Sequence, residues 1–243
     1  MDVSGASFQN QIMLNSPLSM RNPQGDFPTA YDDGEFENIE NNRNGSPVSQ
    51  YMSAEAYKHP KERRQNIAGF KYDNKLSDKD HAIYYHPYKK HKVLATAGTH
   101  SAADIGTDIA LTGHLLSQTR RYNNAKTKYR DMDKKYDGKS YVVGHSLGSR
   151  ISDLLHSKHR SIYGSIGFNG PGAIFDPLTS VTRHIYQTPK QKRLNTHSVQ
   201  YVHAYDPVST FFGRSKRHIV KSHKFRKNPH NLDHWRSHFG DNS

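Results

Sequence analysis

Apolar residues along this 243-residue chain are spaced so that strands and helices should alternate through its second half. Short apolar runs predict buried strands over residues 91–97, 140–143, 162–168 and 198–205. Helical spacing of apolar residues predicts helices over 102–116, with a more polar continuation to about 136, and over 147–156. Because strands that alternate with helices need crossover connections, this order predicts a three-layer α/β fold with a mostly parallel central sheet.

The first 56 residues lack such a pattern. They are rich in Asn, Ser, Gly, Pro and acidic residues, a composition typical of disorder. The whole chain is only 33% hydrophobic, with a mean hydropathy of −0.94. We therefore predict three parts: a disordered acidic arm over 1–56, an irregular transition segment over 57–90, and a folded α/β-hydrolase-like domain over 91–243.

Acidic and basic residues are distributed unevenly between these parts. Residues 1–56 contain eight acidic and two basic residues, whereas residues 57–243 contain 14 acidic and 33 basic ones. A basic body of this kind favours anionic partners. The strongest basic run extends from Arg214 to Lys227, with seven Lys or Arg and no acid. It predicts either a solvated loop or a peripheral contact with an anionic membrane.

The strand predicted at 140–143 leads into Gly144-His145-Ser146-Leu147-Gly148. This G-x-S-x-G pattern is typical of a nucleophile elbow, a sharp strand-to-helix turn with serine at its tip. The five residues alone would be a weak signal, but a β-branched run before them and helical spacing after them match the expected context. Ser146 is therefore the candidate nucleophile, and the N–H of Leu147 would face developing negative charge at a helix N-terminus.

A serine nucleophile needs a base and a carboxylate that orients the base. In hydrolases with this elbow the acid follows the serine in the chain and the histidine comes last. Asp206 directly follows a predicted strand, and Pro207 makes the chain leave the sheet there. Asp176 is a weaker rival, because it lies several residues beyond its strand. Asp206 is thus the candidate carboxylate.

The base must come from the histidines after Asp206. His230 lies in a turn that leads into a short predicted helix, where Asp206 could reach it. His234, one helical turn later, is the alternative catalytic histidine. The other histidines of this region are expected on a solvated basic face.

Five stretches in this order resemble the class 3 lipases, the triacylglycerol-lipase-like branch of the α/β-hydrolases. Ala97-Gly98-Thr99 matches the oxyanion turn, 104–109 the acidic helix start, 144–148 the elbow, Asp206-Pro207-Val208 the acid motif, and 230–235 the histidine turn. The resemblance implies that Thr99 supplies an oxyanion-hole N–H beside that of Leu147. It also implies a carboxylic ester hydrolase, a lipase, esterase or phospholipase, that degrades lipid or other ester substrates without a cofactor. One departure is Ser149, where the family usually has glycine.

Two other function classes compete with this interpretation. The fold could serve a catalytically silent binding protein, or the basic body could belong to a nucleic-acid-binding or virion-associated protein. Aromatic residues are sparse in the basic run and no RNP or zinc-finger pattern occurs, which disfavours nucleic acid as the main partner. With no cysteine and no recognisable histidine spacing, no metal site is expected.

The chain has no apolar run approaching 18 residues, and its first residues do not resemble a signal peptide. We therefore expect a soluble protein, in the cytoplasm or associated with a virion.

Overall fold

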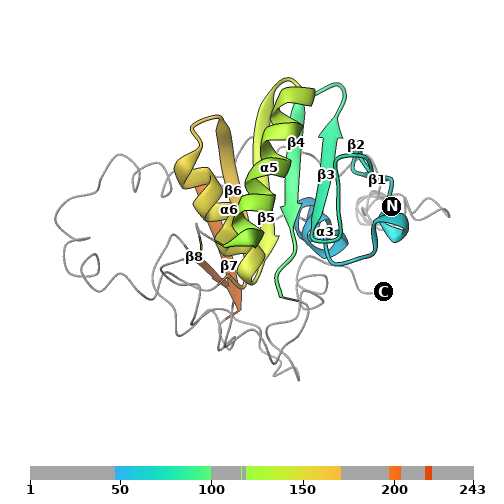
Figure 1. Cartoon of the computed structure of the whole chain (residues 1–243). Coiled ribbons are helices and arrows are strands. Elements are labelled where there is room, and N and C mark those ends of the chain that lie inside the picture. Colours follow the sequence, from blue (N-terminus) through green and yellow to red (C-terminus); the bar gives the residue numbers. More distant parts are fainter. Residues whose placement is uncertain (1–46, 100–115, 117–118, 171–196, 204–216, 221–243) are drawn as a thin grey trace, which may run out of the picture.

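An eight-stranded sheet forms the centre of the described part of the protein, and its strands lie side by side in the order of the sequence. The structure is a computed structural model that describes residues 47–99, 116, 119–170, 197–203 and 217–220 (Figure 1). The strands are β1 (Asn66–Ile67), β2 (Phe70–Tyr72), β3 (His81–His86), β4 (His91–Thr96), β5 (Lys139–His145), β6 (Ile162–Phe168), β7 (Ser198–His203) and β8 (Arg217–Val220).

The sheet has an antiparallel part and a parallel part. Strands β1 to β4 pair antiparallel, whereas β4 to β8 pair parallel. The parallel part confirms the mostly parallel sheet that the alternation of elements predicts. Since parallel strands run in one direction, the carboxyl ends of β4 and β5 lie at the same edge, where ligands bind in open α/β sheets.

Helices cover both faces of the sheet. The helices α5 (Arg120–Lys135) and α6 (Leu147–Lys158) lie on one face, and α3 (Pro47–Glu55) lies on the other (Figure 1). Alternate residues of a strand point to opposite faces, and β5 follows this rule: Val142 packs with the α5 and α6 side chains, whereas Tyr141 and Val143 pack with α3. The predicted three-layer α/β fold is thus confirmed.

Each element predicted in the second half that lies among the described residues is present. The strand at 162–168 has the predicted bounds, the strand at 140–143 extends over 139–145, and the elbow helix ends at residue 158. The polar helix predicted up to about residue 136 corresponds to α5. The helix predicted over 102–116 lies outside the described residues except for Leu116, which is buried.

The structure differs from the predicted boundaries before residue 91. Residues 47–56 belong to the folded domain and not to a disordered arm, because α3 buries Val48, Tyr51 and Met52 against the sheet. Likewise, 57–90 is not an irregular transition segment, since it supplies β1, β2 and β3 and the short 3-10 helix η2 (Pro60–Glu62). Residues 1–46 lie outside the described part, so their predicted disorder stays a prediction.

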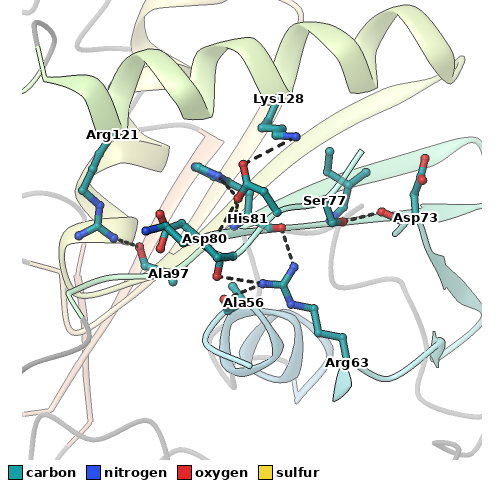
Figure 2. Close-up of polar contacts among 12 residues, drawn as sticks. Ala56, Arg63, Asp73, Ser77, Asp80, His81, Ala97, Arg121 and Lys128 are labelled. Atoms are coloured by element: carbon teal, nitrogen blue, oxygen red, sulfur yellow. Dashed lines mark hydrogen bonds and ion pairs between the residues drawn. The ribbon is translucent and has the colours of Figure 1, made fainter. Parts of the chain in front are cut away.

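A buried arginine ties this N-terminal part together. The guanidinium of Arg63, which is 2% exposed, donates hydrogen bonds to the backbone oxygens of Lys58, Ala56, Lys79 and His81 (Figure 2). A buried charge is tolerated only when it is well hydrogen-bonded. These bonds join the segment after α3 to the start of β3, and the apolar spacing of the sequence gives no sign of them.

Part of the basic run is a strand. Residues Arg217–Val220 form β8, which pairs parallel with β7 through Gln200–Arg217 and the three following residue pairs. The prediction of a loop from Arg214 to Lys227 is therefore wrong for these four residues. The rest of the run lies outside the described residues.

Candidate active site

Ser146 lies at the tip of a sharp turn between the end of β5 and the start of α6. Its backbone has a φ of +54° and a ψ of −128°, a combination that costs a non-glycine residue of the order of 1–3 kcal/mol and is found most often at functional sites. The turn is held by hydrogen bonds from the Ser146 N–H to the Phe168 oxygen and from the N–H groups of Ser149 and Arg150 to the Ser146 oxygen. This is the geometry of a nucleophile elbow.

The two flanking glycines are required by close backbone approaches. A Cβ on Gly144 would lie 2.4 Å from the carbonyl carbon of Gly148, and a Cβ on Gly148 would lie 2.1 Å from the Thr96 oxygen. Both neighbours are backbone atoms, so a side chain could not be accommodated by a rotamer change. The glycines of the motif thus allow α6 to pack directly on β4 and β5.

The Ser146 hydroxyl has no structural task among the described residues. Serine often caps a helix, but here its side chain makes no capping hydrogen bond to α6. Ser146 is 1% exposed, and its Oγ has no hydrogen-bond partner in the part of the chain that the structure describes. Buried hydroxyls are nearly always hydrogen-bonded, and the described part of the chain supplies no partner for this one.

Ser146 precedes the N-terminus of α6 directly. The first turn of α6 contains no acidic residue that would offset the partial positive charge of the helix N-terminus. Leu147 is the first residue of α6, and the first N–H groups of a helix lack partners within the helix. The role of Leu147 as an oxyanion donor stays a prediction.

The predicted oxyanion turn 97–99 lies beside the elbow. It follows β4 directly, and a Cβ on Gly98 would lie 2.9 Å from the Cβ of Ser146 and 2.7 Å from the His145 oxygen. Thr99 is half-buried at the end of this described segment. The structure thus brings the Thr99 turn and Ser146 together at the carboxyl ends of neighbouring parallel strands.

Tyr57 and Arg121 contact the same turn, although no sequence motif points to either residue. The Tyr57 hydroxyl lies 2.8 Å from both the Gly98 nitrogen and Nδ1 of His145. Arg121, on α5, donates to the carbonyl oxygen of Ala97 (Figure 2) and to that of Gly98. Tyr57 lies in a segment predicted to be irregular and Arg121 in a polar helix, so no sequence motif distinguishes either residue.

Ser149 is accommodated by glycines of the neighbouring strand region. It is fully buried and donates a hydrogen bond from its hydroxyl to Oε1 of Gln200 on β7, at 2.8 Å. A Cβ on Gly167 would lie 2.0 Å from the Ser149 Oγ, and one on Gly170 would lie 2.4 Å from it. The departure from the family's glycine therefore does not loosen the packing of α6 on the sheet.

A carboxylate continues this polar link between α6 and β7. Asp153 on α6 accepts hydrogen bonds from the hydroxyls of Ser165 and Ser198 and from Nε2 of Gln200, at 2.8 to 2.9 Å. Burial raises the pKa of Asp153, although Arg150 and these donors act in the opposite direction. The elbow helix is thereby tied to β7, the strand that precedes the candidate carboxylate Asp206.

The remaining predicted site residues are Asp206, His230 and the alternative His234. All three lie outside the described residues, so their roles stay predictions. In the described residues, no cluster of three His, Cys, Asp or Glu side chains could bind a metal. None of the helices in this part is long and apolar enough to cross a membrane.

No family model and no curated protein matches the chain. Among solved structures, the chain is similar to the Lip2 lipase of Yarrowia lipolytica, at 16% identity and a TM-score of 0.45, over 73% of this chain and 74% of that one. A fungal lipase matches at 16% identity and a TM-score of 0.39, over 66% of this chain and 70% of that one. The lipase of Rhizopus microsporus var. chinensis matches at 13% identity and a TM-score of 0.39, over 66% of each chain.

Proposed function

We propose that this protein is a serine hydrolase that cleaves carboxylic esters. The observation that carries the proposal is the Ser146 hydroxyl, buried and without a partner among the described residues at the tip of a strained elbow. Strain and an unused buried hydroxyl both cost stability, so their coincidence at one residue favours a chemical role. The adjacent turn around Gly98 supports the same conclusion.

In the proposed reaction, the Ser146 oxygen attacks the ester carbonyl carbon while His230 accepts the hydroxyl proton and Asp206 orients His230. The carbonyl oxygen becomes an oxyanion, which the N–H groups of Leu147 and Thr99 stabilise. When the tetrahedral intermediate collapses, the ester C–O bond breaks and His230 protonates the departing alcohol. Water then attacks the acyl-enzyme and gives a proton to His230. The bond to the Ser146 oxygen breaks, the carboxylic acid is released, and His230 returns the proton to Ser146.

The substrate class proposed is lipid or other carboxylic esters. The basic run from Arg214 to Lys227 lies between Asp206 and His230 in the chain, and its charge would attract anionic lipid. On this proposal the basic run holds the protein at a membrane surface. The hydrolysis of soluble short esters does not require this run.

The test uses the purified full chain with p-nitrophenyl esters of graded acyl length, a phospholipid, and a fluorophosphonate probe that labels activated serines. The expected result is hydrolysis and stoichiometric labelling, both lost in Ser146→Ala with an unchanged unfolding temperature. Loss of a triad serine commonly costs several orders of magnitude in kcat. A folded wild type that neither hydrolyses any ester nor reacts with the probe would favour a catalytically silent binding protein.

A further inference from the structure

We propose that Tyr57 and Arg121 are positioning residues that hold the turn 97–99 in the orientation needed for oxyanion stabilisation. The inference rests on the proposed ester hydrolysis. It concerns two residues from segments far from the elbow in sequence, which meet at one turn beside Ser146.

Every backbone polar group of Ala97 and Gly98 has a partner. The Ala97 N–H donates to the Asp80 oxygen at 2.9 Å, and the Gly98 N–H donates to the Tyr57 hydroxyl at 2.8 Å. Nη2 of Arg121 donates to the oxygen of Ala97 at 3.1 Å (Figure 2) and to the oxygen of Gly98 at 2.8 Å. The Ala97–Gly98 peptide is thus held from both sides, and the Gly98–Thr99 peptide is held through its carbonyl.

The geometry of the trans peptide carries this restraint to Thr99. In a trans peptide the C=O and the following N–H point in opposite directions, and no described peptide bond is cis. Arg121 attracts the Gly98 carbonyl, so the Thr99 N–H points away from Arg121. The preceding peptide shows the same arrangement, since Ala97 C=O contacts Arg121 while Gly98 N–H contacts Tyr57 on the other side.

Tyr57 also joins the turn to the elbow. Its hydroxyl lies 2.8 Å from Nδ1 of His145, the residue before Ser146, and the two rings pack edge to face with centroids 5.7 Å apart. Burial raises the pKa of Tyr57, although the Gly98 N–H and the charge of Arg121 act in the opposite direction. The hydroxyl is therefore neutral and accepts a hydrogen bond from the Gly98 N–H while it lies within hydrogen-bond distance of Nδ1 of His145.

Positioning by hydrogen bonds of this kind affects the transition state more than substrate binding. The oxyanion forms only when the serine attacks, so a displaced N–H weakens that state and leaves the ground state nearly unchanged. Arg121 is not needed to anchor α5, which buries Tyr122, Ala125, Tyr129 and Met132. Its removal should consequently lower kcat without unfolding the protein.

The experiment compares Tyr57→Phe, Arg121→Met and Arg121→Lys with two matched controls, Tyr88→Phe at an exposed tyrosine and Arg120→Met at the exposed neighbour on α5. For each variant we measure kcat and KM on a soluble short p-nitrophenyl ester, the unfolding temperature, and the affinity for a trifluoromethyl ketone. Such a ketone forms a tetrahedral adduct with the serine and so reports on the oxyanion site.

Tyr57→Phe and Arg121→Met should lower kcat about 10- to 100-fold with KM nearly unchanged, less than the 10²–10³-fold loss of a direct donor. Ketone affinity should fall by a similar factor. Arg121→Lys should restore part of the loss, because an ammonium can still donate to one carbonyl oxygen. Both controls should match the wild type.

An active wild type with folded variants of unchanged kcat and ketone affinity would overturn the inference and leave the proposed function intact. If kcat falls but ketone affinity does not, positioning of the oxyanion turn is also contradicted. If Tyr57→Phe fails to fold, Arg121→Lys and Arg121→Met still decide the question. An inactive wild type that does not react with a fluorophosphonate would instead overturn the proposed function.

Discussion

Gly98 lies directly against Ser146. A Cβ on Gly98 would approach the Ser146 Cβ to 2.9 Å, the His145 carbonyl oxygen to 2.7 Å and the Tyr57 hydroxyl to 2.5 Å. Two of these atoms belong to the elbow itself. Any side chain at residue 98 must therefore displace the turn, the nucleophile, or both.

We predict that Gly98→Ala lowers kcat/KM on a soluble ester by about 100-fold, because a displacement near 1 Å at a reacting centre can have that effect. Overpacking should also cost about 1–3 kcal/mol of stability. Steady-state kinetics and urea unfolding measure the two effects separately. A folded Gly98→Ala variant with wild-type activity would contradict the close contact between the turn and the elbow.

The choice between the two candidate bases can be tested directly. We predict that His230→Ala abolishes ester hydrolysis and fluorophosphonate labelling, because Ser146 would lose its general base. His234→Ala, one helical turn away in sequence, serves as the matched comparison and should retain most activity. If His234→Ala is the inactive variant instead, His234 is the base and the reaction class is unchanged.

Truncation should separate the acidic N-terminal segment from the folded domain. Deleting residues 1–46 should leave activity and unfolding temperature nearly unchanged, because this segment has no apolar periodicity and contains no proposed catalytic residue. Deleting residues 1–56 should greatly reduce stability, since it removes α3 with its buried Val48 and Met52. Loss of one buried side chain of this size alone costs about 2–5 kcal/mol.

Thermal unfolding of both truncated proteins checks this prediction. Equal unfolding temperatures for the two would show that α3 contributes little to the domain. A large loss of stability in the shorter deletion would show that residues before 47 also pack on it.

Acid should weaken one ion pair in a defined pH range. Burial acts to raise the pKa of Asp78, but the hydrogen bond and charge of His81 outweigh it and lower the pKa from 3.8 to about 2. Because the folded-state pKa is below the unfolded one, ionised Asp78 stabilises the fold. Its contribution is complete above about pH 4 and disappears as the pH falls towards about 2.

We therefore predict that Asp78→Asn is less stable than the wild type at about pH 5 and that the difference shrinks as the pH falls to about 2.5. Urea unfolding across this range measures it, with Asp137→Asn as a control that removes one negative charge at an exposed site. A stability difference that does not change with pH would show that Asp78 acts through its hydrogen bonds alone.

The elbow and the parallel part of the sheet could be predicted because their determinants lie in contiguous residues. The apolar run of β5, the glycines at 144 and 148 and the helical spacing of Ile151 and Leu155 are all within one short stretch. The contact of Gly144 with Gly148 lies within the turn itself, whereas that of Gly148 with Thr96 arises because β4 lies beside the turn. For this reason the sequence determined the candidate nucleophile and the strand and helix on either side of it.

Tertiary structure alone decided that residues 47–90 belong to the folded domain and which residues surround the turn 97–99. Val48 and Met52 lie in a polar stretch, and they are buried only because the open face of β4 and β5 is there to receive them. Tyr57 and Arg121 contact Gly98 across 41 and 23 residues of chain. Sequence patterns report the preferences of neighbouring residues, whereas contacts across such separations depend on how the sheet and its two helical layers assemble.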